Sequence, residues 1–299
     1  MNTVALFGAI ETGLVYSLVA IGAFISFRLL RFPDLSVDGT FALGGAVAAV
    51  LIISGVNPYL ATAVAVLAGG AAGLVTAWLY AFLGFLPLLA GILVMIALYT
   101  INIRIMGAPN LPLISSASIY TPLVDRGLAF FYAYPIVVGA VVIIAKLAID
   151  RFLLSRTGFA LRATGTNPSL AQAHGIRTRA MILTGLAAAN GLTALAGAMF
   201  AQSAGNADVS MGIGVVVIGI ASLLIGEALL PTRRIVLMTL ACIIGAIIYR
   251  LAVAFALEAD FLHLQAYDLN LITAILVVLA LLLLRFRGRL SRILTKATP

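Results

Sequence analysis

The chain alternates between long apolar runs and short polar stretches over almost its whole length. An α-helix needs about 17–25 mostly apolar residues to cross the hydrocarbon core of a bilayer. Nine runs come close to this length, at residues 3–27, 39–54, 59–85, 86–106, 128–149, 180–202, 211–230, 235–257 and 269–284. The second run is short, and the third and fourth nearly touch. We therefore expect an all-α polytopic membrane protein with about nine transmembrane helices, forming a single domain over residues 1–299.

Composition supports this fold class and excludes several kinds of protein. Hydrophobic residues make up 63% of the chain and charged residues 9%, which excludes a soluble fold. The net charge is +8, but the basic residues recur at the ends of apolar runs and form no single patch, so we expect no nucleic-acid partner. Cys242 is the only cysteine, and His174 and His263 are isolated, so we expect neither a disulfide framework nor a metal site.

The distribution of basic residues predicts the orientation in the membrane. If the N-terminus faces outward, fifteen of the eighteen lysine and arginine residues lie on the inner side or at an inner span end. They are Arg28, Arg31, Lys146, Arg151, Arg156, Arg162, Arg177, Arg179, Arg233, Arg234, Arg285, Arg287, Arg289, Arg292 and Lys296. Such an excess marks the cytoplasmic side, so we expect N-out, C-in. The first run has no basic segment before it and no cleavage site, so we interpret it as a retained span.

A weak internal repeat appears at an offset of 174 residues. The sequence DLSV at residues 34–37 aligns with DVSM at residues 208–211, and Gly45 aligns with Gly219. Five predicted spans separate the two copies, so one copy begins on the inner side and the other on the outer side. Inverted repeats of this kind are common in transporters, whose pathway lies near the repeat interface. A chance match in a chain of such biased composition is the alternative.

A polar stretch near the middle of the chain carries the signals of a short helix. Asn167 is a preferred N-cap, Pro168 occupies the first helical position, and Gly175 stands where a C-terminal glycine belongs. The helix between them, residues 168–174, is too short to be stable alone. We expect it to lie against a partner, which the small Ala171 and Ala173 would let approach closely. The alternative is a solvated turn between two spans.

Two charged residues lie inside predicted spans. Glu11 and Arg250 are both roughly 10–12 Å from the outer ends of their helices, at a rise of about 1.5 Å per residue. A buried charge is costly unless it is paired, neutralised or exposed to water. We interpret the two residues as a structural ion pair. The alternative is that one or both line a pathway.

The fourth predicted span carries a stripe of mixed chemistry. Met95, Tyr99, Asn102 and Met106 share one face of a helix, because they recur at intervals of four, three and four residues. Thioether, phenol and amide groups suit a moderately polar pathway lining better than lipid. A stripe that packs against another helix is the alternative.

Two acids flank the start of the second span, and we interpret both as structural. Asp34 follows a proline and is typical of a turn, whereas Asp38 precedes Gly39 and is typical of an N-cap. Gly69 and Gly73 form a small-xxx-small pair, which predicts close helix packing.

Three stretches resemble a known family of membrane proteins. TGFALRATG at residues 157–165, followed by Asn167-Pro168 and by AHGI at residues 173–176, resembles the cytoplasmic coupling segment of ABC-importer permeases of the branched-chain amino acid and ribose type. FPDLSVDGTF at residues 32–41 and the stretch from residue 88 to residue 107 resemble one branch of that family. That branch includes permeases proposed to import aromatic amino acids.

The resemblance implies a function and a set of partners. The chain would be the transmembrane permease of a binding-protein-dependent importer in a bacterial inner membrane, working as a homodimer, with an amino acid or related solute as substrate. Separate ATPase subunits would dock on the coupling segment, at about residues 150–179. The docking residues would be Arg162, Gly165, Asn167, Pro168, Leu170, Ala171, Ala173, His174 and Gly175.

ATP chemistry is expected on a partner. The chain has no Gly-x-x-x-x-Gly-Lys-Ser/Thr phosphate loop, so ATP and its magnesium would be held by the ATPase subunits, and we expect neither a cofactor nor enzymatic activity here. The alternative function is an ion-coupled secondary transporter that uses Glu11 as its ion-binding group.

Overall fold

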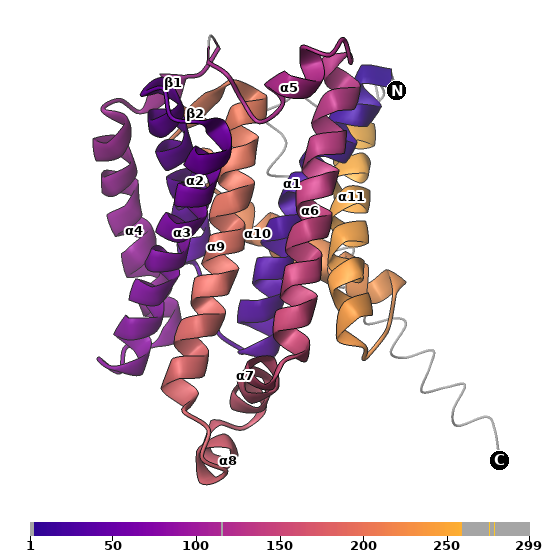
Figure 1. Ribbon diagram of the computed structural model, residues 1–299. Helices are drawn as coiled ribbons and strands as arrows, with labels where there is room; N and C mark the ends of the chain where they lie inside the picture. The colour runs from indigo at the N-terminus through magenta and orange to yellow at the C-terminus, as the bar shows by residue number, and fades with distance from the viewer. Residues whose placement is uncertain (1–2, 115, 259–274, 276–277, 279–299) are drawn as a thin grey trace, which may run out of the picture.

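The computed structural model of the protein describes residues 3–114 and 116–258, together with residues 275 and 278. Within this part of the chain, long helices run side by side from one end of a bundle to the other (Figure 1). We call the end that carries the N-terminus the upper end and the opposite end the lower end, as they appear in Figure 1.

Ten α-helices follow α1 (Thr3–Ala23) in the described chain, and α1 itself continues at the lower end as a π-helical segment, η1 (Phe24–Leu29). They are α2 (Ser36–Ile53), α3 (Pro58–Ala81), α4 (Pro87–Met106), α5 (Thr121–Val124), α6 (Phe130–Leu154), α7 (Arg156–Thr166), α8 (Pro168–Ala173), α9 (Thr178–Ala204), α10 (Val215–Leu229) and α11 (Ile235–Glu258). Proline occupies the first helical position of α3 and α4, where its missing N–H costs nothing. Gly107 and Gly205 end α4 and α9 in the left-handed conformation.

Six helices of the described chain are long and apolar enough to cross a membrane, namely α1 with η1, α2, α3, α4, α9 and α11. The chain is therefore a multi-pass membrane protein. The predicted fifth span corresponds to α6, a helix of 25 residues that runs beside α1 along the height of the bundle (Figure 1). The seventh corresponds to α10, whose 15 residues reach only about 22 Å. The ninth lies outside the described residues, so the count of nine stays a prediction.

Two short strands lie at the upper end and amend the expectation of a purely helical fold. β1 (Asn110–Pro112) pairs antiparallel with β2 (Asn206–Asp208), with Leu111 opposite Ala207. Asp208 accepts hydrogen bonds from Asn110 Nδ2, at 3.1 Å, and from the Ser210 hydroxyl. The Ser210 hydroxyl lowers the pKa of the Asp208 carboxyl from its usual value, against a smaller opposing effect of desolvation. The strands fasten the loop after α4 to the loop after α9.

Glycines bring the central helices into close contact. A Cβ added at Gly73 of α3 would lie 2.3 Å from the backbone oxygen of Leu186 in α9, and one at Gly69 would lie 2.8 Å from that of Asn190. A Cβ added at Gly44 of α2 would lie 2.0 Å from the backbone oxygen of Ala194 in α9. Without these glycines the backbones could not approach, so the predicted packing role of Gly69 and Gly73 is confirmed.

The helices pack in a pattern that occurs twice. α2 packs against α3 and α9, and α3 packs against α9; likewise α10 packs against α11 and α1, and α11 packs against α1. If α1, α2 and α3 are exchanged for α9, α10 and α11, respectively, the same pairs of helices are therefore in contact. The two sets run in opposite directions, because α1 descends and α9 ascends in Figure 1. The turn that precedes α2 and the turn that precedes α10 also match. Asp34 Oδ1 accepts from the N–H and hydroxyl of Ser36, as Asp208 Oδ1 does from those of Ser210.

Candidate functional site

The polar stretch in the middle of the chain projects from the lower end of the bundle as α7 and α8 (Figure 1). Asn167 Oδ1 accepts a hydrogen bond from Leu170 N–H at 3.0 Å, so the predicted N-cap is formed. α8 contains six residues and not the seven predicted, because His174 is already its C-cap. Gly175 follows with a φ of +78°, a conformation that glycine adopts without strain.

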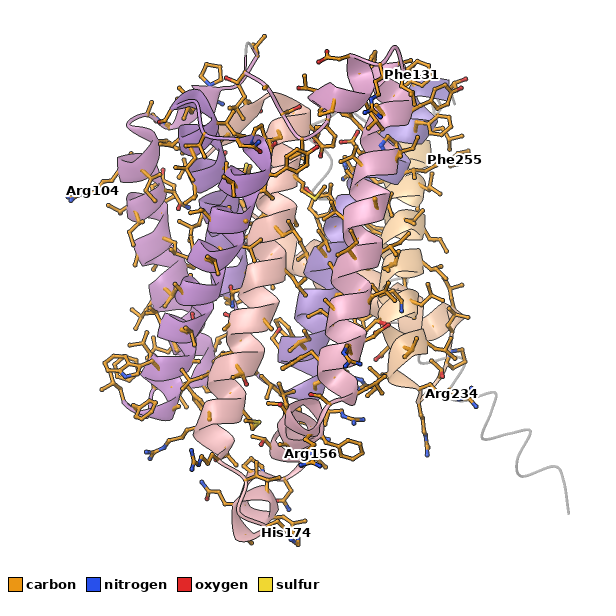
Figure 2. All side chains as sticks on the ribbon, in the orientation of Figure 1. Arg104, Phe131, Arg156, His174, Arg234 and Phe255 are labelled. Atoms are coloured by element: carbon orange, nitrogen blue, oxygen red, sulfur yellow. The ribbon has the colours of Figure 1, made fainter. Side chains whose placement is uncertain are left out.

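The two alanines of α8 face opposite ways. Ala171 is 3% exposed and is covered by its own chain, which leaves little of its side chain for contact with a partner. Ala173 and His174 are exposed, and Leu170 is 56% exposed. Figure 2 shows His174 at the lowest point of the bundle, with Arg156 above it on α7. The surface that α8 offers to another molecule includes Leu170, Ala173 and His174, together with the exposed Pro168, Ser169 and Gln172.

α7 links this surface to the end of α1. A Cβ at Gly165 would lie 1.8 Å from the backbone oxygen of Leu29, so α7 and η1 are in backbone contact there. Arg162 is held within α7, because its Nε donates to Gly158 O at 3.3 Å and its guanidinium lies 4.3 Å from the centroid of the Phe159 ring. The buried Gly165 therefore fixes the position of the segment, whereas Arg162 is half-buried and lies along α7.

A cavity of about 470 Å³ lies beside α4. Three of the four residues predicted from the α4 stripe line it, namely Met95, Tyr99 and Asn102. The other lining residues are Asp38, Gly39, Ile96, Thr100, Val209 and Ile213. Met106, the fourth residue of the stripe, is 7% exposed and packs in an apolar cluster with Ala201 and Ala207. The cavity combines apolar walls with a carboxylate, an amide and a phenol.

Asp38 connects two helices at this cavity. It lies in the first turn of α2, and its carboxylate accepts from Gly214 N–H at 3.0 Å and Val216 N–H at 2.7 Å. It therefore caps α10 and not its own helix, which begins two residues earlier, so the predicted role as cap of the second span is wrong. α10 can begin part-way through the bundle because Asp38 satisfies N–H groups at its start. A negative group at that position complements the positive end of the helix.

Asn102 carries an unpartnered acceptor. The side chain is 0% exposed, and its Nδ2 donates to Gly39 O at 3.1 Å. Its Oδ1 has no hydrogen-bond partner. Leaving a buried acceptor unpaired costs about 1–3 kcal/mol, so this atom is a candidate for contact with a ligand.

A buried polar cluster fixes the start of α2 next to the cavity. Asp34 is 0% exposed and accepts from Ser36 N–H at 2.9 Å, from the Ser36 hydroxyl at 2.6 Å and from Asn190 Nδ2 at 2.7 Å. The hydrogen bond to Ser36 N–H confirms the predicted turn role of Asp34. Its bond to Asn190, on α9, ties the two central helices together.

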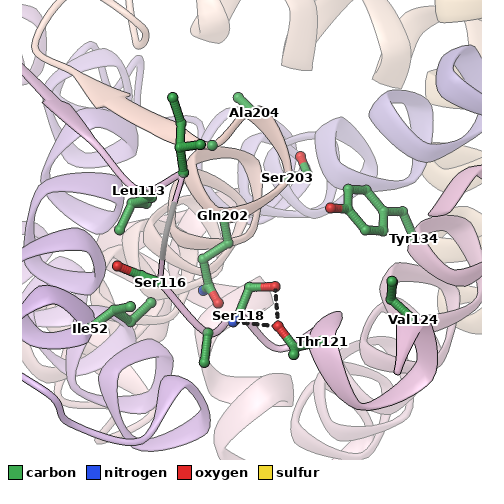
Figure 3. Close-up of a pocket in the computed structure, with 13 residues that line it drawn as sticks. Ile52, Leu113, Ser116, Ser118, Thr121, Val124, Tyr134, Gln202, Ser203 and Ala204 are labelled. Atoms are coloured by element: carbon green, nitrogen blue, oxygen red, sulfur yellow. Dashed lines mark hydrogen bonds between the residues drawn. The ribbon is translucent and has the colours of Figure 1, made fainter. Parts of the chain in front are cut away.

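Glu11 lies elsewhere, near the upper end of the bundle beside Ser203. Ser203 lines a second cavity, of about 300 Å³, with Gln202, Ser118, Thr121 and Tyr134. Figure 3 shows the hydrogen bonds between Ser118 and Thr121 at this cavity.

The predicted ion pair between Glu11 and Arg250 is not among the ion pairs of the described chain. Arg250 Nε donates instead to Thr12 Oγ1 at 3.1 Å, and its guanidinium lies 5.1 Å from the centroid of the Tyr16 ring. Neither residue lines the cavity beside α4.

Comparison with known proteins identifies the family. The sequence model of the branched-chain amino acid transport system permease component matches residues 5–285. The chain belongs to this permease family. The permease is 39% identical over 266 residues to a protein named tyrosine transport system permease protein from Clostridioides difficile (strain R20291), covering 89% of the chain and 86% of the relative. It is 31% identical over 278 residues to an uncharacterized protein of Rickettsia prowazekii (strain Madrid E), covering 91% and 95%. No solved structure matches the permease.

Sequence reasoning missed part of the permease's cavity. Val209 and Ile213 reach it because the chain between β2 and α10 descends to Asp38, 176 residues away from Gly214 along the sequence. The spacing of apolar residues carries no signal for such a contact. The repeated Asp-x-Ser turn was a signal, since it precedes both α2 and α10, the two helices that Asp38 connects.

Proposed function

We propose that this permease is the transmembrane subunit of a binding-protein-dependent ABC importer, and that it moves an amino acid inward with energy from separate ATPase subunits. Its family supports this proposal, because a permease component belongs to a transport system with further components. The single observation that carries it is the geometry of α8, a capped six-residue helix with Leu170, Ala173 and His174 exposed at its surface. An isolated helix of that length is unstable, so contact with a partner surface would stabilise it.

The proposal includes the partners and their places. Two copies of the chain surround the pathway, an ATPase subunit docks on α8 of each copy, and a substrate-binding protein delivers the solute at the upper end. ATP and magnesium are bound by the ATPase. The lower end faces the cytoplasm of a bacterium and the N-terminus faces outward, because the basic residues of the described chain gather at the lower end; Figure 2 shows Arg156 and Arg234 there.

The substrate follows from the named relative. A protein 39% identical over most of the chain is called a tyrosine transport system permease, so we propose an aromatic amino acid as the solute. The repeated packing of α1 to α3 and α9 to α11 supports an inverted repeat, whose interface is where transporters place their pathway.

Affinity purification of the tagged permease from its native membrane tests the central point. Mass spectrometry should detect an ATPase with a phosphate loop, and liposomes that contain the purified complex should accumulate tyrosine only when ATP and the binding protein are present. Accumulation driven by a proton or sodium gradient without ATP would overturn the proposal and favour the ion-coupled alternative.

Orientation can be tested by cysteine labelling in intact cells. Ser54 follows α2 at the upper end and Ser169 lies in α8 at the lower end, and both side chains are exposed. An impermeant maleimide should label Ser54→Cys from outside and should label Ser169→Cys only after the membrane is opened. Cys242 is buried and serves as a silent background. Labelling of Ser169→Cys in intact cells would contradict the N-out orientation.

A further inference from the structure

The cavity beside α4 contains acceptors for hydrogen bonds and few free donors on its Asp38 side. The two oxygens of Asp38 each accept one backbone N–H from the start of α10, and each keeps a further lone pair. Asn102 Oδ1 is buried and unpartnered, and Asn102 Nδ2 is already engaged by Gly39 O. A ligand that fills these positions must bring its own donors.

The rest of the wall is apolar and aromatic. Met95 supplies a polarisable thioether and Tyr99 a ring, both of which make favourable contacts with aromatic groups. Tyr99 and Thr100 also carry hydroxyl groups, which can donate to an anionic group. A volume of about 470 Å³ falls within the range of about 300–1,000 Å³ that small-molecule sites occupy. The complementary ligand has an ammonium group, a carboxylate and an apolar or aromatic body.

The position of the cavity provides an independent argument. Asp38 and Gly212 stand 174 residues apart, the offset of the internal repeat, and a Cβ at Gly212 would lie 1.9 Å from the backbone oxygen of Asp38. Equivalent residues of an inverted repeat meet only at the axis that relates the two copies. Transporters place their substrate site at that interface, next to helices that begin inside the membrane, as α10 does here.

We propose that this cavity is a substrate site within the membrane, where Asn102 Oδ1 and Asp38 accept the ammonium group of an aromatic amino acid and Met95 and Tyr99 contact its ring. This inference rests on the proposed importer function and deepens it, because the permease itself then selects the solute that the binding protein delivers. The N-terminus of α10 offsets part of the charge of Asp38. Weak binding follows, as a pathway that must release its solute requires.

Protection of an introduced cysteine tests the site directly. Ile96 lines the cavity and is 59% exposed, so Ile96→Cys should react with a water-soluble methanethiosulfonate in the purified complex of permease and ATPase, without binding protein. Millimolar tyrosine should slow that reaction several-fold. Tyramine, which keeps the ammonium group, should also slow it, whereas 3-(4-hydroxyphenyl)propionate, which lacks that group, should not.

Variants at Asn102 identify the acceptor. Asn102→Leu should remove the protection, and Asn102→Asp, which keeps an acceptor of the same shape, should retain at least part of it. Ile101→Leu is the matched control, because Ile101 precedes Asn102 on α4, is 44% exposed and does not line the cavity. It should leave protection by tyrosine unchanged.

The possible outcomes separate this inference from the proposed function. If ATP-driven tyrosine uptake occurs but tyrosine gives no protection, the cavity is no substrate site and the importer function stands. Protection by sodium ions alone, or equal protection by 3-(4-hydroxyphenyl)propionate, would also overturn the inference, because a cation or the ring would then suffice. Protection by tyrosine with uptake that needs no ATP would support the site and overturn the importer function.

Discussion

Asn190→Ala should destabilise the permease by about 3 kcal/mol, since leaving a buried hydrogen-bonding group unpaired costs about 1–3 kcal/mol and more when that group is charged. Asn190 Nδ2 donates to Asp34 Oδ2 at 2.7 Å, and both side chains are 0% exposed. Truncation leaves the Asp34 carboxylate with only the two hydrogen bonds from Ser36. It also opens a gap where α3 and α9 are in backbone contact, next to Gly73.

Thermal melting of the solubilised protein measures this effect, and a double-mutant cycle isolates its cause. Asp34→Ala combined with Asn190→Ala should cost clearly less than the two single changes together, because the second removes a partner that is already lost. Asn57→Ala is the control: Asn57 is exposed and caps α3 through Tyr59 N–H, so its loss should cost only about 1 kcal/mol. Additive effects of Asp34→Ala and Asn190→Ala would show that the two side chains are not coupled.

The pattern of apolar runs predicted most of the helices because a bilayer imposes one length on every span. α3 and α4 begin within one residue of their predicted starts, at Pro58 and Pro87, since proline and glycine mark their ends in the sequence. α2 begins at Ser36, three residues before the predicted start. The polar residues Ser36 and Asp38 belong to that helix because partners inside the protein satisfy them, and a hydropathy pattern cannot see those partners.

A sequence pattern does not show contacts between helices, and this also explains which site residues were predicted correctly and which were not. Met95, Tyr99 and Asn102 were predictable because they share one face of one helix, whatever packs beside it. Asp38 was assigned to its own helix because local capping is the common case, yet it caps a helix that starts 177 residues later. The spacing also placed Glu11 and Arg250 at matching depth, but Glu11 lies beside Ser203 while Arg250 bonds Thr12. Depth alone does not specify which face of a helix a residue occupies.

α8 provides the last and largest expected effect. Ala173→Arg should reduce uptake at least tenfold and release the ATPase from the solubilised permease. Ala173 is exposed two residues beyond the buried Ala171, so its methyl group points away from the bundle. Arginine there adds several heavy atoms and a charge to the surface that the ATPase is proposed to contact. A loss of about 1.4 kcal/mol in the interface already corresponds to a tenfold weaker complex.

The fold itself should tolerate Ala173→Arg, because substitutions at exposed positions usually change stability by no more than about 0.5 kcal/mol. Thermal melting and size-exclusion chromatography should therefore match the unaltered permease, while co-purification of the ATPase is lost. Leu83→Arg is the control: Leu83 is 50% exposed in the loop between α3 and α4, at the same lower end but outside α8, and should keep the ATPase bound. Ala171→Arg should instead lower the melting temperature, since Ala171 is covered by its own chain. If Ala173→Arg retained both the ATPase and uptake, α8 would be an ordinary loop helix, and the docking of the ATPase would have to be sought on another part of the lower end.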